Sequence, residues 1–73
     1  GLDEKILKEL IISALKNGPL KKADIYEAVK HAFPDVLTEE KQYKKLSNLL
    51  QKMKKEGIID VRGSAVRAEW FLV

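Results

Sequence analysis

Apolar residues recur at intervals of three and four along the first half of the chain, which is the pattern of amphipathic helices. The first apolar stripe predicts a helix over residues 4–17. Gly18 and Pro19 end it, because glycine can adopt a left-handed C-terminal conformation and proline cannot continue a helix. A second stripe predicts a helix over residues 21–33, which ends before Pro34 because the residue before a proline disfavours helical geometry.

The third helical pattern is the longest and covers residues 39–56. Thr38 can cap its first N–H groups, and Glu39 and Glu40 complement the positive end of the helix. The pattern stops at Gly57. The expected apolar face consists of Tyr43, Leu46, Leu49, Leu50 and Met53.

After Gly57 the sequence becomes β-prone and predicts a hairpin over residues 58–73, with a turn at Gly63 and Ser64. An isolated hairpin is marginally stable, so one of its faces should pack onto the helices. The residues expected on that face are Ile59, Val61, Trp70 and Leu72. Together the elements predict an α+β fold, a three-helix bundle with a C-terminal two-stranded hairpin, in a single domain that spans residues 1–73.

The composition excludes several classes of protein. The 73 residues include no cysteine, which excludes a disulfide framework and a thiolate metal site and favours an intracellular location. The longest apolar runs, residues 10–12 and 70–73, are too short to span a bilayer, and the N-terminal residues do not have the pattern of a signal peptide. Gly1 stands where an initiator methionine is expected, so we expect the chain to be a domain of a longer protein.

The positive charge is concentrated in one segment. The chain has 14 Lys and Arg against 11 Asp and Glu, a formal charge of +3. Residues 39–56 hold six lysines and three glutamates and therefore carry the whole excess, while no acid lies between Lys41 and Lys55. A localised cationic segment indicates a polyanionic partner more clearly than the overall charge does.

Two segments carry a resemblance to a known family. They are residues 18–25 (GPLKKADI) and residues 46–59 (LSNLLQKMKKEGII), followed by the Trp70-Phe71-Leu72 run. The chain resembles winged helix-turn-helix domains, in which a segment like 46–59 joins the recognition helix to a β-hairpin called the wing. The resemblance covers nearly the whole chain, although the connection from Phe33 to Thr38 is longer than the tight turn of a minimal helix-turn-helix.

The resemblance implies that the third helix binds double-stranded DNA, and such domains can be modules of larger regulatory or DNA-acting proteins. At 100° per residue, its lysine and amide side chains cluster opposite the apolar face. Lysine binds phosphate as a point charge, and Asn and Gln can pair with adenine. The implied DNA-binding residues are Lys41, Lys44, Lys45, Asn48, Lys52 and Lys55 on the helix and Arg62 and Arg67 on the wing, with Gln42 at the flank of the helix face.

Other interpretations of the same residues stay open. The lysine-rich face can be solvated surface, and Arg62 and Arg67 can protect an edge strand from pairing with other chains. Lys21 and Lys22 can contact phosphate at the start of the second helix or be ordinary surface lysines. Ile12, on the polar face of the first helix, can mark a contact with a partner protein or a second copy. The alternative function is a winged-helix protein-interaction module that binds an acidic partner or another part of its parent protein, and RNA is a third possible ligand.

Catalysis and cofactor binding have little support in the sequence. His31 is the single histidine and has no cysteine or second histidine with which to bind a metal ion. The serines have no nucleophile-elbow context, and the chain has no phosphate-binding glycine loop. We therefore expect no enzyme activity, no cofactor, no small-molecule substrate and no membrane association.

Overall fold

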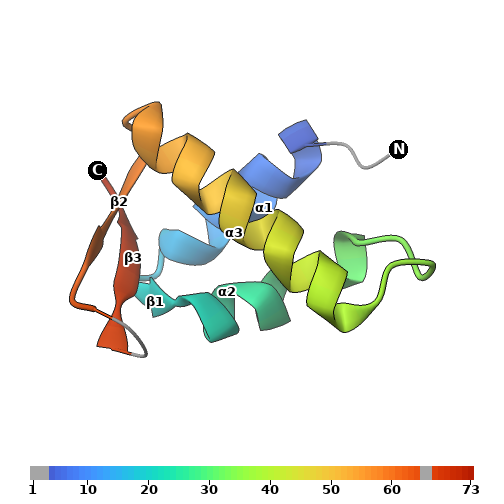
Figure 1. The fold of residues 1–73 in the computed structure, drawn as a ribbon. Helices are drawn as coiled ribbons and strands as arrows, with labels where there is room; N and C mark the ends of the chain where they lie inside the picture. The colour runs from blue at the N-terminus through green and yellow to red at the C-terminus, as the bar shows by residue number, and fades with distance from the viewer. Residues whose placement is uncertain (1–3, 65–66) are drawn as a thin grey trace.

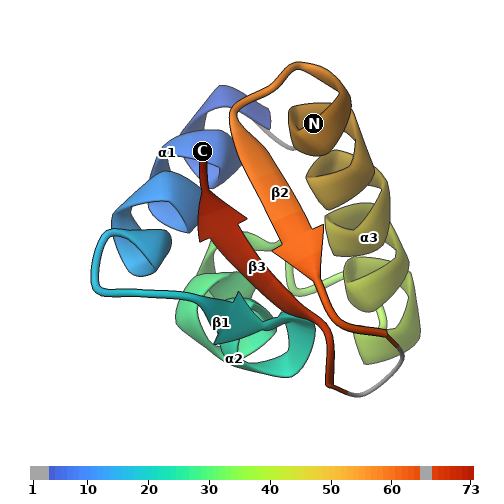
Figure 2. The ribbon, with the colours of Figure 1, turned by 90° about the vertical axis from the view of Figure 1, so that its left-hand side faces the viewer.

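The computed structural model describes residues 4–64 and 67–73. Three α-helices, α1 (Glu4–Leu15), α2 (Lys22–Val29) and α3 (Glu39–Lys55), precede an antiparallel hairpin of β2 (Ile59–Arg62) and β3 (Glu69–Leu72) (Figure 1). A two-residue strand, β1 (Leu20–Lys21), pairs with the other edge of β3, so the sheet has the order β1-β3-β2 (Figure 2). This arrangement confirms the predicted α+β class, and its topology is winged-helix-like.

The core lies where the apolar faces of the helices meet one face of the sheet. The stripe of α3 is almost completely buried at Leu46, Leu50 and Met53, which confirms the period read from the sequence. Trp70 and Ile59 close the core from the side of the sheet and are also buried. In the register of the hairpin, Ile59 faces Leu72 and Val61 faces Trp70, so the expected inward-facing residues share one face. Within residues 4–64 and 67–73, no helix is long and apolar enough to cross a bilayer.

Both ends of α3 are capped by local sequence. The Thr38 hydroxyl accepts a hydrogen bond from the Lys41 N–H at 3.3 Å, as expected of an N-cap. At the other end, Gly57 has a φ of 81°, and two backbone bonds run from Gly57 N–H to Lys54 O and from Ile58 N–H to Met53 O. These two bonds form a Schellman motif, which satisfies carbonyl groups that the helix leaves unpaired. The helix boundary and the start of the wing are therefore set by one glycine.

The structure corrects several boundaries. The first helix ends at Leu15 rather than 17, and the second ends at Val29 and continues as a 3₁₀ turn, η1 (Lys30–Ala32). The strand β1 was not predicted. The hairpin has strands of four residues each and a longer connection than a tight Gly63-Ser64 turn, although Gly63 does adopt a positive φ of 83°.

Ile12 is less exposed than its place among polar residues in the helical projection suggests. It is half-buried and packs against the core, because α1 is covered by α2, α3 and β3 rather than by a single neighbour. A contact of Ile12 with a partner stays a prediction. The exposed large apolar side chains of the described residues are instead Ile6, Val36 and Val73.

Candidate nucleic-acid interface

One side of α3 carries all of the lysine and amide side chains that the sequence singled out on this helix, apart from Gln42. Because the opposite side is buried against α1, α2 and the sheet, these residues face solvent. We call this surface the basic face. It consists of the exposed residues Lys41, Lys44, Lys45, Asn48, Gln51, Lys52 and Lys55.

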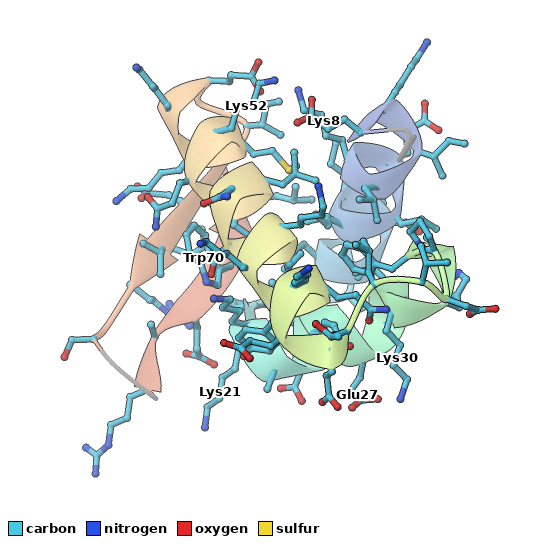
Figure 3. All side chains as sticks on the ribbon, turned by 45° about the vertical axis from the view of Figure 1, so that its right-hand side comes forward. Lys8, Lys21, Glu27, Lys30, Lys52 and Trp70 are labelled. Carbon is cyan, nitrogen blue, oxygen red and sulfur yellow. The ribbon has the colours of Figure 1, made fainter. Side chains whose placement is uncertain are left out.

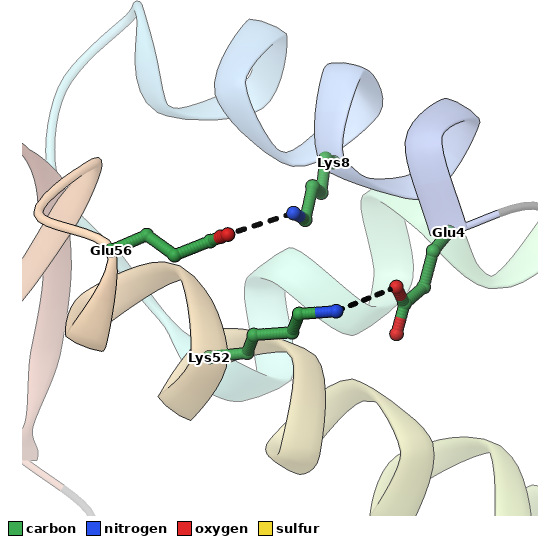
Figure 4. Close-up of polar contacts among 4 residues, drawn as sticks. All are labelled: Glu4, Lys8, Lys52 and Glu56. Carbon is green, nitrogen blue, oxygen red and sulfur yellow. Dashed lines mark hydrogen bonds and ion pairs between the residues drawn. The ribbon is translucent and has the colours of Figure 1, made fainter.

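The edge of the basic face nearest α1 is partly neutralised. Lys52 Nζ lies 3.0 Å from Glu4 Oε2, and Lys8 Nζ lies 3.0 Å from Glu56 Oε1 (Figure 4). The hydrogen bond from Lys52 to Glu4, together with the negative charge of that carboxylate, raises the pKa of Lys52 above its usual value. Of the predicted contacts, Lys52 therefore already has an anionic partner within the chain.

The other lysines of the basic face have no such partner. Among residues 4–64 and 67–73, the ion pairs involve Lys8, Lys30, Lys52 and Arg62 as cations. Lys41, Lys44, Lys45 and Lys55 are absent from these pairs and exposed. Four uncompensated ammonium groups along one helix create a localised positive surface that is accessible to anionic groups.

Gln42 does not belong to the basic face. Its side-chain oxygen accepts a hydrogen bond of 2.6 Å from the Tyr26 hydroxyl, and its amide nitrogen donates to Leu37 O at 3.1 Å. The half-buried amide thus ties α3 to α2 and to the connection that precedes α3. These hydrogen bonds give Gln42 a structural role that helical angle alone does not show, because the angle does not tell which flank of α3 meets α2.

Lys22 also joins two helices rather than standing free at the start of α2. Its ammonium group donates to Ser47 Oγ and lies 4.3 Å from the centre of the Tyr43 ring. Burial lowers the pKa of Lys22 below its usual value. Lys21, by contrast, is exposed and projects from the lower edge of the molecule in Figure 3.

A surface groove with a volume of about 490 Å³ runs between α2, α3 and the wing. It brings the start of α2 and the middle of α3 next to the beginning of β3, three segments far apart in the sequence. The lining residues are Lys21, Lys22, Ala23, Tyr43, Ser47, Gln51, Ala68 and Trp70. The groove is therefore lined by residues of both α3 and the hairpin, among them Ser47 and Gln51 on the helix and Ala68 before β3.

The two wing arginines have different surroundings. Arg62 Nε lies 3.5 Å from Glu69 Oε1, its cross-strand neighbour, and the guanidinium lies 5.8 Å from the Phe71 ring. Arg67 is exposed and forms no ion pair within the described residues; its backbone N–H donates to Ser64 O. From the sequence, both arginines flank the turn and are expected to be equally available. In the structure, the strand register places a carboxylate, that of Glu69, opposite Arg62 but not opposite Arg67.

The remaining candidates take structural or surface positions. Trp70 is 6% exposed and lies between the sheet and the helices, so its ring supports the wing and is not a free stacking platform (Figure 3). His31 is exposed, as expected. No group of three or more His, Asp or Glu side chains in the described part of the chain is arranged to hold a metal ion.

Comparison of the chain with protein-family models, with curated proteins and with solved structures found no match. The winged-helix-like topology therefore rests on the order of the elements and on the pairing of β1, β2 and β3.

Proposed function

We propose that this chain is a winged-helix domain that binds double-stranded DNA, with the basic face of α3 in the major groove and the wing against the flanking backbone. The observation that carries the proposal is the exposed row of lysines on α3 that have no acidic partner among the described residues. A row of this kind costs stability through like-charge repulsion between neighbours such as Lys41 and Lys45. Contact with phosphates would relieve that repulsion.

The shape of the molecule supports this mode of binding. The major groove of B-DNA is about 12 Å wide and accepts a single α-helix. The capped helix α3 runs along one side of the domain next to β2 of the hairpin (Figure 2), and its basic face is exposed. A helix in the groove with a wing beside it is the docking geometry that this arrangement favours.

The cations of the basic face favour affinity over discrimination. The basic face has lysines and no arginine, so it lacks the bidentate contacts that arginine makes to guanine. Lys41, Lys44, Lys45 and Lys55 on the helix, with Arg67 on the wing, would neutralise phosphates. Lys52 and Arg62 would contribute less, since each already pairs with a carboxylate.

The alternative is a protein-interaction module that binds an acidic partner or another part of a longer protein. Ile12 is half-buried and packs against the core, so it offers such a partner less apolar surface than a fully exposed side chain would. An acidic protein could still bind the lysines, and the experiment below distinguishes it from DNA. Binding, rather than catalysis, is the activity that we propose.

The experiment is fluorescence anisotropy of the full chain with a random-sequence DNA duplex of about 20 base pairs at low salt. The matched ligand is an RNA duplex of the same length, which has a similar phosphate density but a deep and narrow major groove that side chains cannot read. We expect micromolar or tighter binding to DNA and weaker binding to RNA. Absence of DNA binding by the folded chain would refute the proposal. Equal affinity for both duplexes would show general polyanion binding and refute the docking of α3 in the groove.

A further inference from the structure

Three amide side chains lie on α3, and only one of them forms side-chain hydrogen bonds within the described residues. Gln42 is half-buried and has both ends of its amide in hydrogen bonds. Asn48 and Gln51 are exposed, and neither has a side-chain hydrogen bond to any residue within 4–64 or 67–73. These two amides therefore keep a donor and an acceptor available for an external ligand.

Asn48 and Gln51 also occupy the part of α3 that projects furthest from the core. Buried residues such as Leu46 and Met53 mark the inner side of the helix. The side of the helix opposite these buried residues carries a row of four polar side chains at spacings of four, three and four residues: Lys44, Asn48, Gln51 and Lys55. We call this row the outer ridge. A helix that enters a groove places its outermost row closest to the floor, where the base edges lie.

The spacing of the two amides matches neighbouring base pairs. Residues three apart on an α-helix are separated by about 4.5 Å along the axis and by about 60° around it. Successive bases on a DNA strand are about 3.4 Å apart along the duplex. Two side chains at this separation reach adjacent base pairs, or base pairs one step apart, rather than the same base.

From this geometry we infer that Asn48 and Gln51 read adenine in the major groove, so that the chain prefers DNA with two closely spaced A·T pairs. Each amide nitrogen donates to adenine N7, and each amide oxygen accepts from the adenine N6 amino group. Lys44 and Lys55, at the two ends of the outer ridge, hold the flanking phosphates and fix the register of the pair of amides. The inference rests on the proposed DNA binding and adds a base preference to it.

The test begins with selection of DNA duplexes from a random library by the full chain, followed by anisotropy with the preferred site. A second duplex carries 7-deazaadenine in place of each adenine, which removes the N7 acceptor and leaves base pairing intact. We expect the preferred site to be bound about tenfold or more tightly than a G·C-rich site. The 7-deazaadenine duplex should lose most of that preference.

The variants Asn48→Ala and Gln51→Ala should each lose part of the preference and become insensitive to 7-deazaadenine at one position. Both substitutions are at exposed helix positions where alanine is favourable, so the variants should fold. Asn17→Ala is the matched control, since it removes an exposed amide in the turn after α1, on the other side of the molecule from α3 (Figure 2). It should leave the preference unchanged.

The outcomes separate this inference from the function on which it rests. Failure to bind any duplex would overturn both. Binding without base preference, or a preference that the two variants and 7-deazaadenine leave intact, would overturn only the reading of adenine. A preference that falls in the variants and not in Asn17→Ala would support it.

Discussion

On α3, lysines such as Lys44 and Lys45 extend from an exposed face that has no carboxylate between Lys41 and Lys55, whereas on the wing Arg62 lies beside Glu69 and over Phe71. The two regions therefore hold cations in different ways. The antiparallel pairing of β2 and β3 places Arg62 directly across from Glu69, so that the two opposite charges interact. A helix face without acids brings like charges together at spacings of three and four.

This difference shows that the availability of a cation depends on what the fold places opposite it. Arg62 and Arg67 are only five positions apart, yet one is paired across the hairpin and the other is exposed. Lys52 and Lys45 are both on α3, yet Lys52 meets Glu4 of α1. Four predictions test whether the unpaired cations, rather than all cations, bind DNA.

The largest effect should come from the double variant Lys44→Glu/Lys45→Glu. It places two acids on the basic face and should weaken duplex binding more than about a hundredfold at low salt, because each acid replaces an attraction to phosphate by a repulsion. Both positions are exposed, so the melting temperature should stay within a few degrees of that of the parent. The measurements are anisotropy and thermal unfolding.

The matched control is Lys16→Glu/Lys30→Glu, which makes the same change in net charge at two exposed positions outside α3. We expect it to weaken binding much less, since only overall attraction is reduced. Equal losses in the two double variants would mean that net charge, and not the basic face, governs binding.

Salt should produce the next largest effect. If the four lysines of the basic face that have no ion pair within the described residues each neutralise one phosphate, the logarithm of the affinity should fall against the logarithm of salt concentration with a slope of about −3.6. Between about 50 and 200 mM salt, this corresponds to a loss of about a hundredfold. A titration with no salt dependence would contradict phosphate contact, and a slope near −1 would contradict contact along the whole helix.

The wing arginines should differ by a smaller factor. Arg67→Ala removes an exposed cation and should weaken DNA binding about threefold to fivefold, whereas Arg62→Ala should change it less than about twofold. The Glu69→Gln variant sharpens the comparison because it frees Arg62 from its partner; in that background, Arg62→Ala should weaken binding as much as Arg67→Ala does. If Arg62→Ala has the larger effect in the parent chain, the pairing with Glu69 does not limit its availability.

Glu4→Gln should have the smallest effect. It frees Lys52 for phosphate and should strengthen DNA binding up to about threefold, with little change in stability, because exposed ion pairs contribute little. It should also return the pKa of Lys52 toward its ordinary value, which NMR titration of the side chain measures directly. An unchanged pKa would show that Glu4 does not hold Lys52 in solution.

The sign of the pH dependence follows from the direction of that shift. Glu4 raises the pKa of Lys52 in the folded chain, so the pair stabilises the fold at neutral pH. This contribution is lost as the pH rises through the raised pKa, above the ordinary lysine value of about 10.4. In Glu4→Gln, the loss of stability in this alkaline range should be smaller.

Most of the fold could be predicted because its signals are local. The stripe from Leu46 to Met53, the Thr38 cap and Gly57 identify α3 to within one residue. The alternation in the hairpin identifies Ile59 and Trp70 as core residues. The strand β1 could not be predicted in the same way, because two residues are too few to show a period of two.

The candidate site was predicted less completely. The exposed lysines and Asn48 lie where the helical period places them. Gln42 and Lys22 look like surface residues in the sequence, but they join α2 to α3 because Tyr26 and Ser47 lie opposite them. The helical period places Gln51 on the same polar face, but it becomes a specific candidate only once its lack of a hydrogen-bond partner within the described residues is known.

By itself, the sequence determined the three helices, the hairpin, the core residues and the concentration of positive charge on α3, since periodicity, caps and charge runs depend on residues close together in the chain. Only the tertiary structure decided which polar groups remain available: Lys52, Arg62, Gln42 and Lys22 have partners, while Lys44, Lys45, Asn48 and Gln51 do not have one among the described residues. The physical reason is that a side chain is neutralised or satisfied by groups within hydrogen-bond distance, and those groups come from segments as far as 48 residues away in the chain.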